Sequence, residues 1–254
     1  MESTLQLLWA LGLMVIAIAL SAWQRLGLEW SLALATGRTV LQLLVVGYVL
    51  AAVFAFKNPL LVLGLLAVML VTATIVARNR ISQKVPHLFA IVGGAMAIGT
   101  LLTLVYTMLF IIQPPTWYEP QFLIPLAGIV LGNAMNGAAL TGERLVSTLN
   151  SSQLEIETHL SLGATPQQAV SRYRQEAIRA GLIPTINTMM VVGLVTLPGI
   201  MTGQLLSGVD PLVATSYQMV IMFMLAFTTL VTTLLVTTGI CRQYFTQAGQ
   251  LTTW

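Results

Sequence analysis

Long apolar runs separated by short polar connections dominate this chain. Charged residues interrupt it at intervals of about twenty residues, the length that an α-helix needs to cross the hydrocarbon core of a bilayer. The pattern predicts an all-α polytopic membrane protein with a single transmembrane domain over residues 1–254. The seven expected spans are Leu5–Ala22, Thr39–Phe56, Pro59–Ala77, Leu88–Ile112, Phe122–Leu140, Leu182–Leu206 and Leu212–Ile240.

The first and the sixth predicted spans each carry a feature that the other spans lack. The segment before the first span carries Glu2 and no Lys or Arg, so we interpret the span as a membrane helix rather than a secretory signal. The sixth span is longer than a bilayer requires, and Pro198 and Gly199 interrupt it. Since proline removes a backbone donor and glycine loosens the helix, we expect a break or gate at these two residues, on the outer side.

The placement of Lys and Arg predicts the orientation, because cytoplasmic connections are enriched in both. With seven spans, Lys57 is the only cationic residue on one side of the membrane. The other side holds Arg25, Arg38, Arg78, Arg80, Lys84, Arg144, Arg172, Arg174, Arg179 and Arg242. The N-terminus is therefore expected outside and the C-terminus in the cytoplasm.

The longest connection covers residues 141–181 and falls on the predicted cytoplasmic side. An apolar stripe at helical spacing begins it, made of Leu145, Leu149, Ser152, Ile156 and Leu160. Gly163 is typical of a helix C-terminus, and Thr165 followed by Pro166 is typical of the start of a helix. A second helix is expected from Pro166 to about Ala180, with Val170, Tyr173 and Ala177 on one face. The two helices should meet at a turn that projects into the cytoplasm.

Composition excludes several classes of protein. Of the 254 residues, 57% are apolar and 7% are charged, and the mean hydropathy is +0.88. Soluble domains carry about 25% charged residues, so a soluble enzyme, a disordered chain and a nucleic-acid binder are all excluded. Because Cys241 is the single cysteine, an intrachain disulfide is ruled out, and Cys241 is expected to serve as a small buried or interfacial apolar residue.

Catalytic motifs are missing from the sequence, and so is the G-x-x-x-x-G-K-[ST] loop that binds the phosphates of ATP. No acidic residue falls well inside a predicted span, so a proton- or sodium-driven carrier would lack its usual groups. We therefore expect a chain that is not itself an enzyme and binds no cofactor. If it transports a solute, the energy should come from elsewhere.

Uncharged amides do occur within the predicted spans, at Gln42, Asn133, Asn136 and Asn187. Asn133 and Asn136 are three residues apart, which puts them on one helix face. Amides that face lipid cost free energy, so these should face other helices or water. Hydrogen bonding between helices and a translocation path are both open interpretations. For the threonine-rich stretch Thr228–Thr238 and the small-residue pairs Gly128/Gly132 and Gly199/Gly203, interhelical packing is the expected role.

Several sequence strings resemble a known family. The segment Glu157-Thr-His-Leu-Ser-Leu-Gly163-Ala-Thr-Pro166 resembles the coupling segment of ABC-transporter permeases. Other strings are similar to the FetB-like iron-export ABC permeases, a family related to plant aluminium-tolerance permeases. They are Gly37-Arg38, Gln42-Leu-Leu, Val46-Gly-Tyr-Val-Leu50, Gly132-Asn-Ala-Met135, Ile178-Arg-Ala-Gly-Leu-Ile-Pro184 and Val192-Gly-Leu-Val-Thr-Leu-Pro-Gly199.

This resemblance implies a permease that exports iron from the plasma membrane with ATP hydrolysed by a separate ABC ATP-binding subunit. It also implies a complex of two permeases and two ATPases. The residues expected to contact the ATPase are Glu157, Leu162, Gly163, Ala164, Thr165 and Pro166. The residues alone do not indicate iron, since its usual carboxylate, imidazole or thiolate ligands form no cluster in the spans. Another metal, a nucleotide sugar, an ATP-independent channel or carrier, and a membrane scaffold stay open as alternatives.

Overall fold

The computed structural model describes residues 2–56, 58–82, 84–246 and 249–252, and of residues 2–8 the backbone alone. Lys57, which the orientation argument used, lies outside the described residues. In chain order the helices are α1 (Glu2–Trp23), α2 (Glu29–Phe56), α3 (Pro59–Ile81), α4 (Leu88–Tyr106), the π-helical η1 (Thr107–Ile112), α5 (Pro120–Ser151), α6 (Gln153–Ser161), α7 (Pro166–Val191), α8 (Gly199–Leu206) and α9 (Pro211–Gln243). The chain forms two compact units, Met1–Asn58 and Pro59–Trp254.

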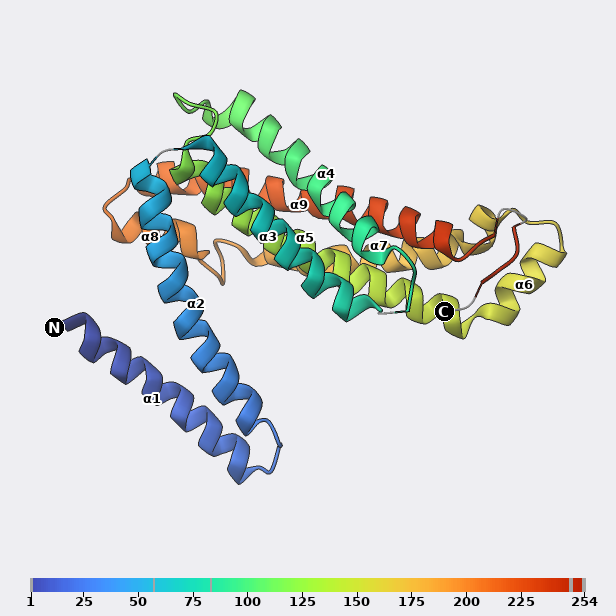
Figure 1. Ribbon diagram of the computed structural model, residues 1–254, viewed down its shortest axis with the longest axis horizontal. Helices are drawn as coiled ribbons and strands as arrows, with labels where there is room; N and C mark the ends of the chain where they lie inside the picture. Colours follow the sequence, from blue (N-terminus) through green and yellow to red (C-terminus); the bar gives the residue numbers. More distant parts are fainter. Residues whose placement is uncertain (1, 57, 83, 247–248, 253–254) are drawn as a thin grey trace. The chain divides into compact units, whose positions relative to one another are not determined.

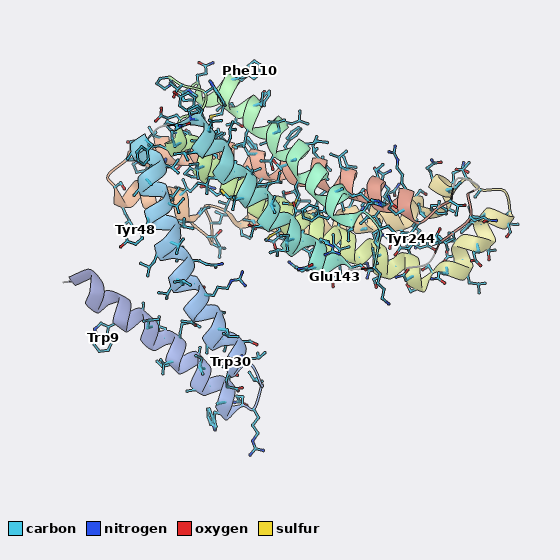
Figure 2. The ribbon with its side chains drawn as sticks, viewed as in Figure 1. Trp9, Trp30, Tyr48, Phe110, Glu143 and Tyr244 are labelled. Atoms are coloured by element: carbon cyan, nitrogen blue, oxygen red, sulfur yellow. The ribbon has the colours of Figure 1, made fainter. Side chains whose placement is uncertain are left out.

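The first unit is a hairpin of α1 and α2. Arg25 and Gly27 both adopt left-handed backbone conformations in the turn between the helices, with φ of 53° and 70°. Across the hairpin, the Ser21 hydroxyl donates to the Glu29 carboxylate at 3.0 Å. Most side chains of α2 are exposed, and Trp30 and Tyr48 stand out from it (Figure 2). So much exposed apolar surface requires lipid or another chain to cover it.

The second unit is a bundle in which α3, α4, α5, α7 and α9 run alongside one another in alternating directions (Figure 1). Helix α5 contacts α3, α4, α7 and α9 and so forms the centre of the bundle. Helix α6 lies at one end of the bundle and α8 at the other. The α6 end also contains the last turns of α3 and α9, with their basic residues Arg78, Arg80 and Arg242.

Glycine and threonine bring the helices of this bundle close together. A Cβ atom on Gly181 of α7 would lie 2.8 Å from the carbonyl oxygen of Gly137 on α5, so the two backbones nearly touch. The same contact brings Gly181 against Thr141. Along α9, buried threonines face the neighbouring helices: Thr228, Thr229, Thr232, Thr233 and Thr237. This confirms the packing role predicted for the threonine-rich stretch.

The glycine pairs chosen from the sequence are not the ones that make these contacts. A Cβ atom on Gly132, Gly199 or Gly203 would meet nothing within 4 Å, and one on Gly128 would meet only the end of Met69. The sequence spacing identifies a small-residue face, but it does not say whether another helix packs against that face. The close contacts involve Gly99, Gly137, Gly142, Gly181 and Gly239 instead.

Among the described residues, five helices are long and apolar enough to cross a membrane: α2, α3, α4 with η1, α5 and α9. The remaining two predicted spans are different. Helix α1 contributes a described apolar segment of intermediate length, Trp9–Trp23. The sixth span, predicted as Leu182–Leu206, is not one helix, because α7 ends at Val191 and α8 begins at Gly199.

One helix boundary predicted from the sequence was wrong, and one helix extends beyond its predicted span. Helix α5 continues from the fifth predicted span, which ends at Leu140, as far as Ser151, and the end of the span stays a prediction. The helix expected to end near Ala180 continues to Val191 and includes Pro184. In both cases the change from apolar to polar sequence marks a change in what surrounds the helix. Helical backbone continues through it, even though Pro184 supplies no backbone N–H to the carbonyl of Ala180.

Candidate functional site

The turn between α6 and α7 is built from two helix-terminal motifs in succession. At the end of α6, the Gly163 amide donates to the Leu160 carbonyl and the Ala164 amide donates to the His159 carbonyl, each at 3.0 Å. These two bonds form a Schellman motif, which requires a left-handed residue, and Gly163 has a φ of +91°. Any side chain at this position would strain the turn.

Helix α7 then begins with a capping box. The Gln168 amide donates to the Thr165 hydroxyl at 3.3 Å, and the Thr165 amide donates to the Gln168 side chain at 2.9 Å. Pro166 occupies the first helical position, where its missing amide costs nothing. The sequence therefore specifies the α6–α7 turn closely, and the turn presents one conformation to a partner.

Buried side chains hold α6 on the bundle. Ile156 is fully buried, together with Leu149 of α5 and Val170 of α7. Tyr173 of α7 is also buried, and burial and then a hydrogen bond to Glu155 raise the pKa of its phenol above 10.0. The burial of Val170, Tyr173 and Ala177 confirms the apolar face predicted for the second helix. The stripe predicted for the first helix is buried at Leu145, Leu149 and Ile156, but the structure divides it at Ser152 between the end of α5 and α6.

The outer surface of the same segment carries two leucines that are exposed rather than buried. Leu154 on α6 and Leu162 in the turn are each 80% exposed. Glu157 and Thr165 are exposed beside them, and Ala164 and Pro166 are half-buried. A rigid turn that carries exposed leucines at the basic end of the bundle can insert into a complementary pocket of another protein.

Tyr244, the residue that follows α9, joins the C-terminal residues to the end of α5. The buried Tyr244 donates its hydroxyl to the Asn150 side chain at 3.2 Å, and its carbonyl accepts from the Thr252 amide at 2.8 Å. These bonds join Tyr244 to the end of α5 and Thr252 to Tyr244. Figure 2 shows Tyr244 near the end of α9.

A second polar group lies inside the bundle, where α5, α7 and α9 meet. The Asn133 amide donates to the Thr185 hydroxyl at 3.0 Å and to the Thr229 hydroxyl at 2.6 Å. The Thr229 hydroxyl in turn donates to the Leu225 carbonyl of its own helix at 2.7 Å. Both donors of a partly buried amide are thus satisfied among apolar side chains, which such a group requires.

The other predicted path residues do not join this group. Asn136 is exposed and accepts from Arg80 of α3 at 3.3 Å, so it contacts a different helix from Asn133. Asn187 is exposed on α7. Gln42 is exposed on α2, in the first unit. A translocation path through all four residues stays a prediction.

The segment from Val192 to Pro198 separates α7 from α8. The Gly193 amide donates to the Thr196 carbonyl at 2.9 Å, which closes a tight loop with Gly193 at a φ of 80°. Pro198 is the residue that precedes α8, and Gly199 is the first residue of that helix. Leu194 and Val195 are strongly exposed in the loop. A gate at this position stays a prediction.

Arg80 and Arg174 contributed only to the predicted orientation, whereas the structure gives each of them a polar partner. Arg80 contacts the Asn136 amide, and Arg174 reaches from α7 to the hydroxyls of Thr237 and Thr238 on α9. A signal existed for Arg174, because it lies one residue from Tyr173 on a face that the periodicity predicted to be buried. Among the described residues, no group of three or more His, Cys, Asp or Glu side chains could hold a metal ion.

Comparison with known proteins places these features in a family context. The model of the family described as "Uncharacterised protein family (UPF0014)" matches residues 4–245. The chain is 54% identical to the UPF0014 membrane protein slr1647 of Synechocystis sp. over 243 residues, which cover 96% of this chain and 94% of that protein. It is 35% identical to the probable iron export permease protein FetB of Escherichia coli over 242 residues, which cover 95% and 92% of the two chains.

A plant relative matches over a similar length. The chain is 33% identical to the protein ALUMINUM SENSITIVE 3 of Arabidopsis thaliana over 244 residues, which cover 96% of this chain and 88% of that protein. No solved structure matches the chain. The relatives confirm the resemblance that the sequence strings indicated.

Proposed function

The chain belongs to the UPF0014 family of membrane permeases, and we propose that it is the membrane subunit of an ABC transporter that exports iron. The ATP that drives it is hydrolysed by a separate ATP-binding subunit. Support for the cargo comes from the similarity to a probable iron export permease. The coupling mechanism has its own support in the α6–α7 turn.

The observation that carries this proposal is the exposure of Leu162 at the tip of a turn that is otherwise tightly specified. Leucine is 80% exposed there, although the bonds around Gly163 and Thr165 leave the backbone one conformation. A flexible loop would absorb the motion of a partner, whereas this turn transmits it to α7 and through Gly181 to α5. Closure of the ATPase pair then moves α7 and switches the bundle between inward-open and outward-open states.

The proposed complex contains two permeases and two ATPases in the plasma membrane. Each permease crosses the bilayer seven times, with its N-terminus outside and its C-terminus in the cytoplasm. The sixth crossing is the broken one, made by the apolar half of α7, the segment 192–198 and α8. This topology puts the basic end of the bundle in the cytoplasm, where the positive-inside rule favours it.

Within each permease, the proposed path passes the amides of Gln42, Asn133, Asn136 and Asn187, and Pro198–Gly199 forms the outer gate. Asn133 is the best supported of these residues, because its amide lies inside the bundle and contacts two threonines on moving helices. Amide and hydroxyl oxygens bind metal ions weakly, and weak ligands suit a cargo that must leave again.

The test begins with a tagged permease purified from its own membranes in mild detergent, with its partners identified by mass spectrometry. We expect an ABC ATP-binding subunit to co-purify. Leu162→Asp should abolish that association because it puts a charge at the docking tip, while the exposed position leaves folding intact. The matched control is Thr158→Ala on the exposed face of α6, which should retain the partner.

A second variant tests coupling rather than docking. Gly163→Pro cannot adopt the left-handed backbone and removes the amide that bonds to Leu160, so the turn must change shape. The permease should remain in the membrane, but its stimulation of ATP turnover should be lost. Normal stimulated turnover in both variants, or the absence of any ATP-binding partner, would contradict the proposal.

A further inference from the structure

A cavity of about 580 Å³ lies between the first half of α7 and the last turns of α9. Its volume is within the range of small-molecule sites. Arg174 and Arg242 are the charged residues among those that line it, and none of the described lining residues is acidic. A cavity with this charge attracts anions.

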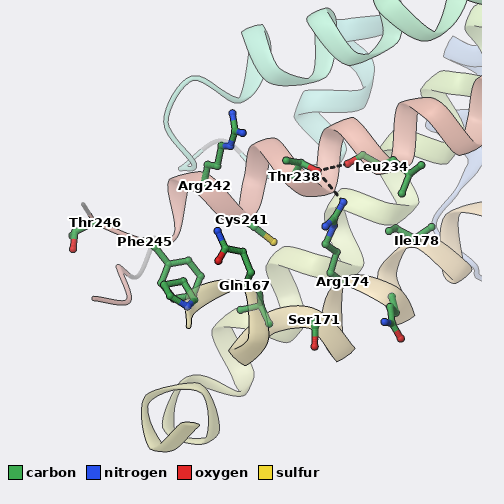
Figure 3. A pocket seen from close by; sticks show the side chains of 13 residues that line it. Gln167, Ser171, Arg174, Ile178, Leu234, Thr238, Cys241, Arg242, Phe245 and Thr246 are labelled. Carbon is green, nitrogen blue, oxygen red and sulfur yellow. Dashed lines mark hydrogen bonds between the residues drawn. The ribbon is translucent and has the colours of Figure 1, made fainter. Parts of the chain in front are cut away.

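Arg174 is held in place as a binding group would be. Its Nε donates to the Thr237 hydroxyl at 3.1 Å, and its Nη2 donates to the Thr238 hydroxyl at 2.9 Å. Figure 3 shows the side chain reaching from α7 to Thr238 on α9. Among the described residues, no carboxylate lies within ion-pair distance of Arg174, whereas Arg172 pairs with Glu176 at 3.3 Å. Its charge is therefore uncompensated, and the remaining donors of its guanidinium are available.

The lining combines this charge with apolar and amide groups. Gln167 and Gln175 supply amides, and Ile178 and Leu234 supply the apolar wall. Leu234 precedes Arg242 by eight residues, which is about 12 Å along a helix. The cavity therefore runs along the last turns of α9, a helix that is long and apolar enough to cross a membrane.

We propose that this cavity binds the phosphate headgroup of an anionic phospholipid. The planar guanidinium of Arg174 contacts the phosphate, as arginine forks do. The acyl chains lie against Ile178 and Leu234. Because the site joins α7 to α9 next to the start of the α6–α7 turn, the bound lipid supports the turn in one position. The proposed lipid site is formed by described residues of this chain, and lipid binding there does not depend on an ATPase.

The test uses the purified, delipidated permease in neutral detergent. Dioctanoyl phosphatidylglycerol, dioctanoyl phosphatidylcholine and inorganic phosphate are each titrated, and binding is followed by native mass spectrometry and by melting temperature. We expect phosphatidylglycerol to bind at least ten times more tightly than phosphatidylcholine. Inorganic phosphate that binds as tightly as phosphatidylglycerol would keep the phosphate site but overturn its assignment to lipid.

Variants decide whether the cavity is responsible. Arg174→Gln should weaken phosphatidylglycerol binding at least tenfold, and Arg174→Lys should weaken it several-fold because the charge remains but the fork is lost. The matched control is Arg179→Gln, which removes the same charge from an exposed position on the same helix outside the cavity. Equal losses in Arg174→Gln and Arg179→Gln would reduce the effect to surface charge and overturn the proposal.

A further variant keeps the test valid if Arg174→Gln fails to fold. Ser171 is exposed where it lines the cavity, so Ser171→Trp puts a bulky ring into the cavity while the Arg174 side chain itself is retained. We expect this variant to lose phosphatidylglycerol binding and to elute as the wild type does in size-exclusion chromatography. Wild-type binding in a well-folded Ser171→Trp variant would overturn the proposal.

Discussion

Helices α2 and α9 have nearly equal mean hydropathy, yet they lie in very different surroundings. Of the most apolar stretch of α9, 44% of the residues are buried inside the structure, whereas in α2 the share is 6%. Small residues occur along both helices, so the residue types alone do not explain the difference. The threonines of α9 pack against glycines of α4 and α5, whereas a Cβ atom added to Gly37 or Gly47 of α2 would meet nothing within 4 Å. Hydropathy identifies a helix that can cross a membrane, but only the tertiary contacts of its small residues show where another helix packs against it.

The largest effect is expected where two helix backbones nearly touch. Gly181→Val would put a branched side chain against Thr141 and the carbonyl of Gly137, which cannot move away. We expect a loss of about 3 kcal/mol or more in the free energy of unfolding, and little folded protein in fluorescence size-exclusion chromatography. Gly47→Val on α2 is the control, since its Cβ atom would meet nothing within 4 Å. A well-folded Gly181→Val variant would break the distinction between the two regions.

Two leucine-to-alanine substitutions compare a buried large side chain in one region with an exposed one in the other. Leu131 on α5 is buried, and Leu131→Ala should lower the free energy of unfolding by about 2 kcal/mol because contacts are lost and the bundle closes only partly. Leu44 on α2 is exposed, and Leu44→Ala should cost less than about 0.5 kcal/mol. Thermal unfolding in one detergent measures both. An equally large loss for Leu44→Ala would mean that another chain covers α2 in the purified protein.

Substitutions of Asn133 and Gln42 distinguish an effect on stability from an effect on transport. Asn133→Leu leaves the Thr185 hydroxyl without its donor and should cost roughly 1–2 kcal/mol, while Gln42→Leu should leave the melting temperature unchanged. If both residues line the path, both variants should slow metal export from cells that contain the complete transporter. Export at the wild-type rate in Gln42→Leu would remove that residue from the path.

The smallest effect concerns a single bond between helices. The hydroxyls of Thr103 on α4 and Thr228 on α9 lie 2.5 Å apart, and both residues are buried. Thr103→Val keeps the shape and removes this contact together with the bond from the Thr103 hydroxyl to the Gly99 carbonyl of its own helix, so we expect a loss of about 0.6 kcal/mol. Thr72→Val on the exposed face of α3 removes only a bond to its own helix and should have no measurable effect. Equal melting temperatures for the two variants would show that burial, rather than the bond, holds α4 on α9.

The sequence by itself determined the class of protein, most of the helices and the α6–α7 turn. These depend on local chemistry: apolar length specifies a span, and the Gly163, Thr165 and Pro166 side chains act on backbone groups within a few residues. The resemblance to FetB-like permeases was also visible in short strings, and the relatives bear it out.

Only the tertiary structure decided where helices end and which polar groups meet. Polar residues follow the predicted end of the fifth span at Leu140, and the structure shows that α5 continues through them as a helix to Ser151. Asn133 and Asn136 share a helix face in the sequence, yet one contacts α7 and α9 and the other contacts α3. The cavity at Arg174 is formed by residues more than fifty positions apart in the chain. Such contacts depend on the direction of neighbouring helices, which no local pattern contains.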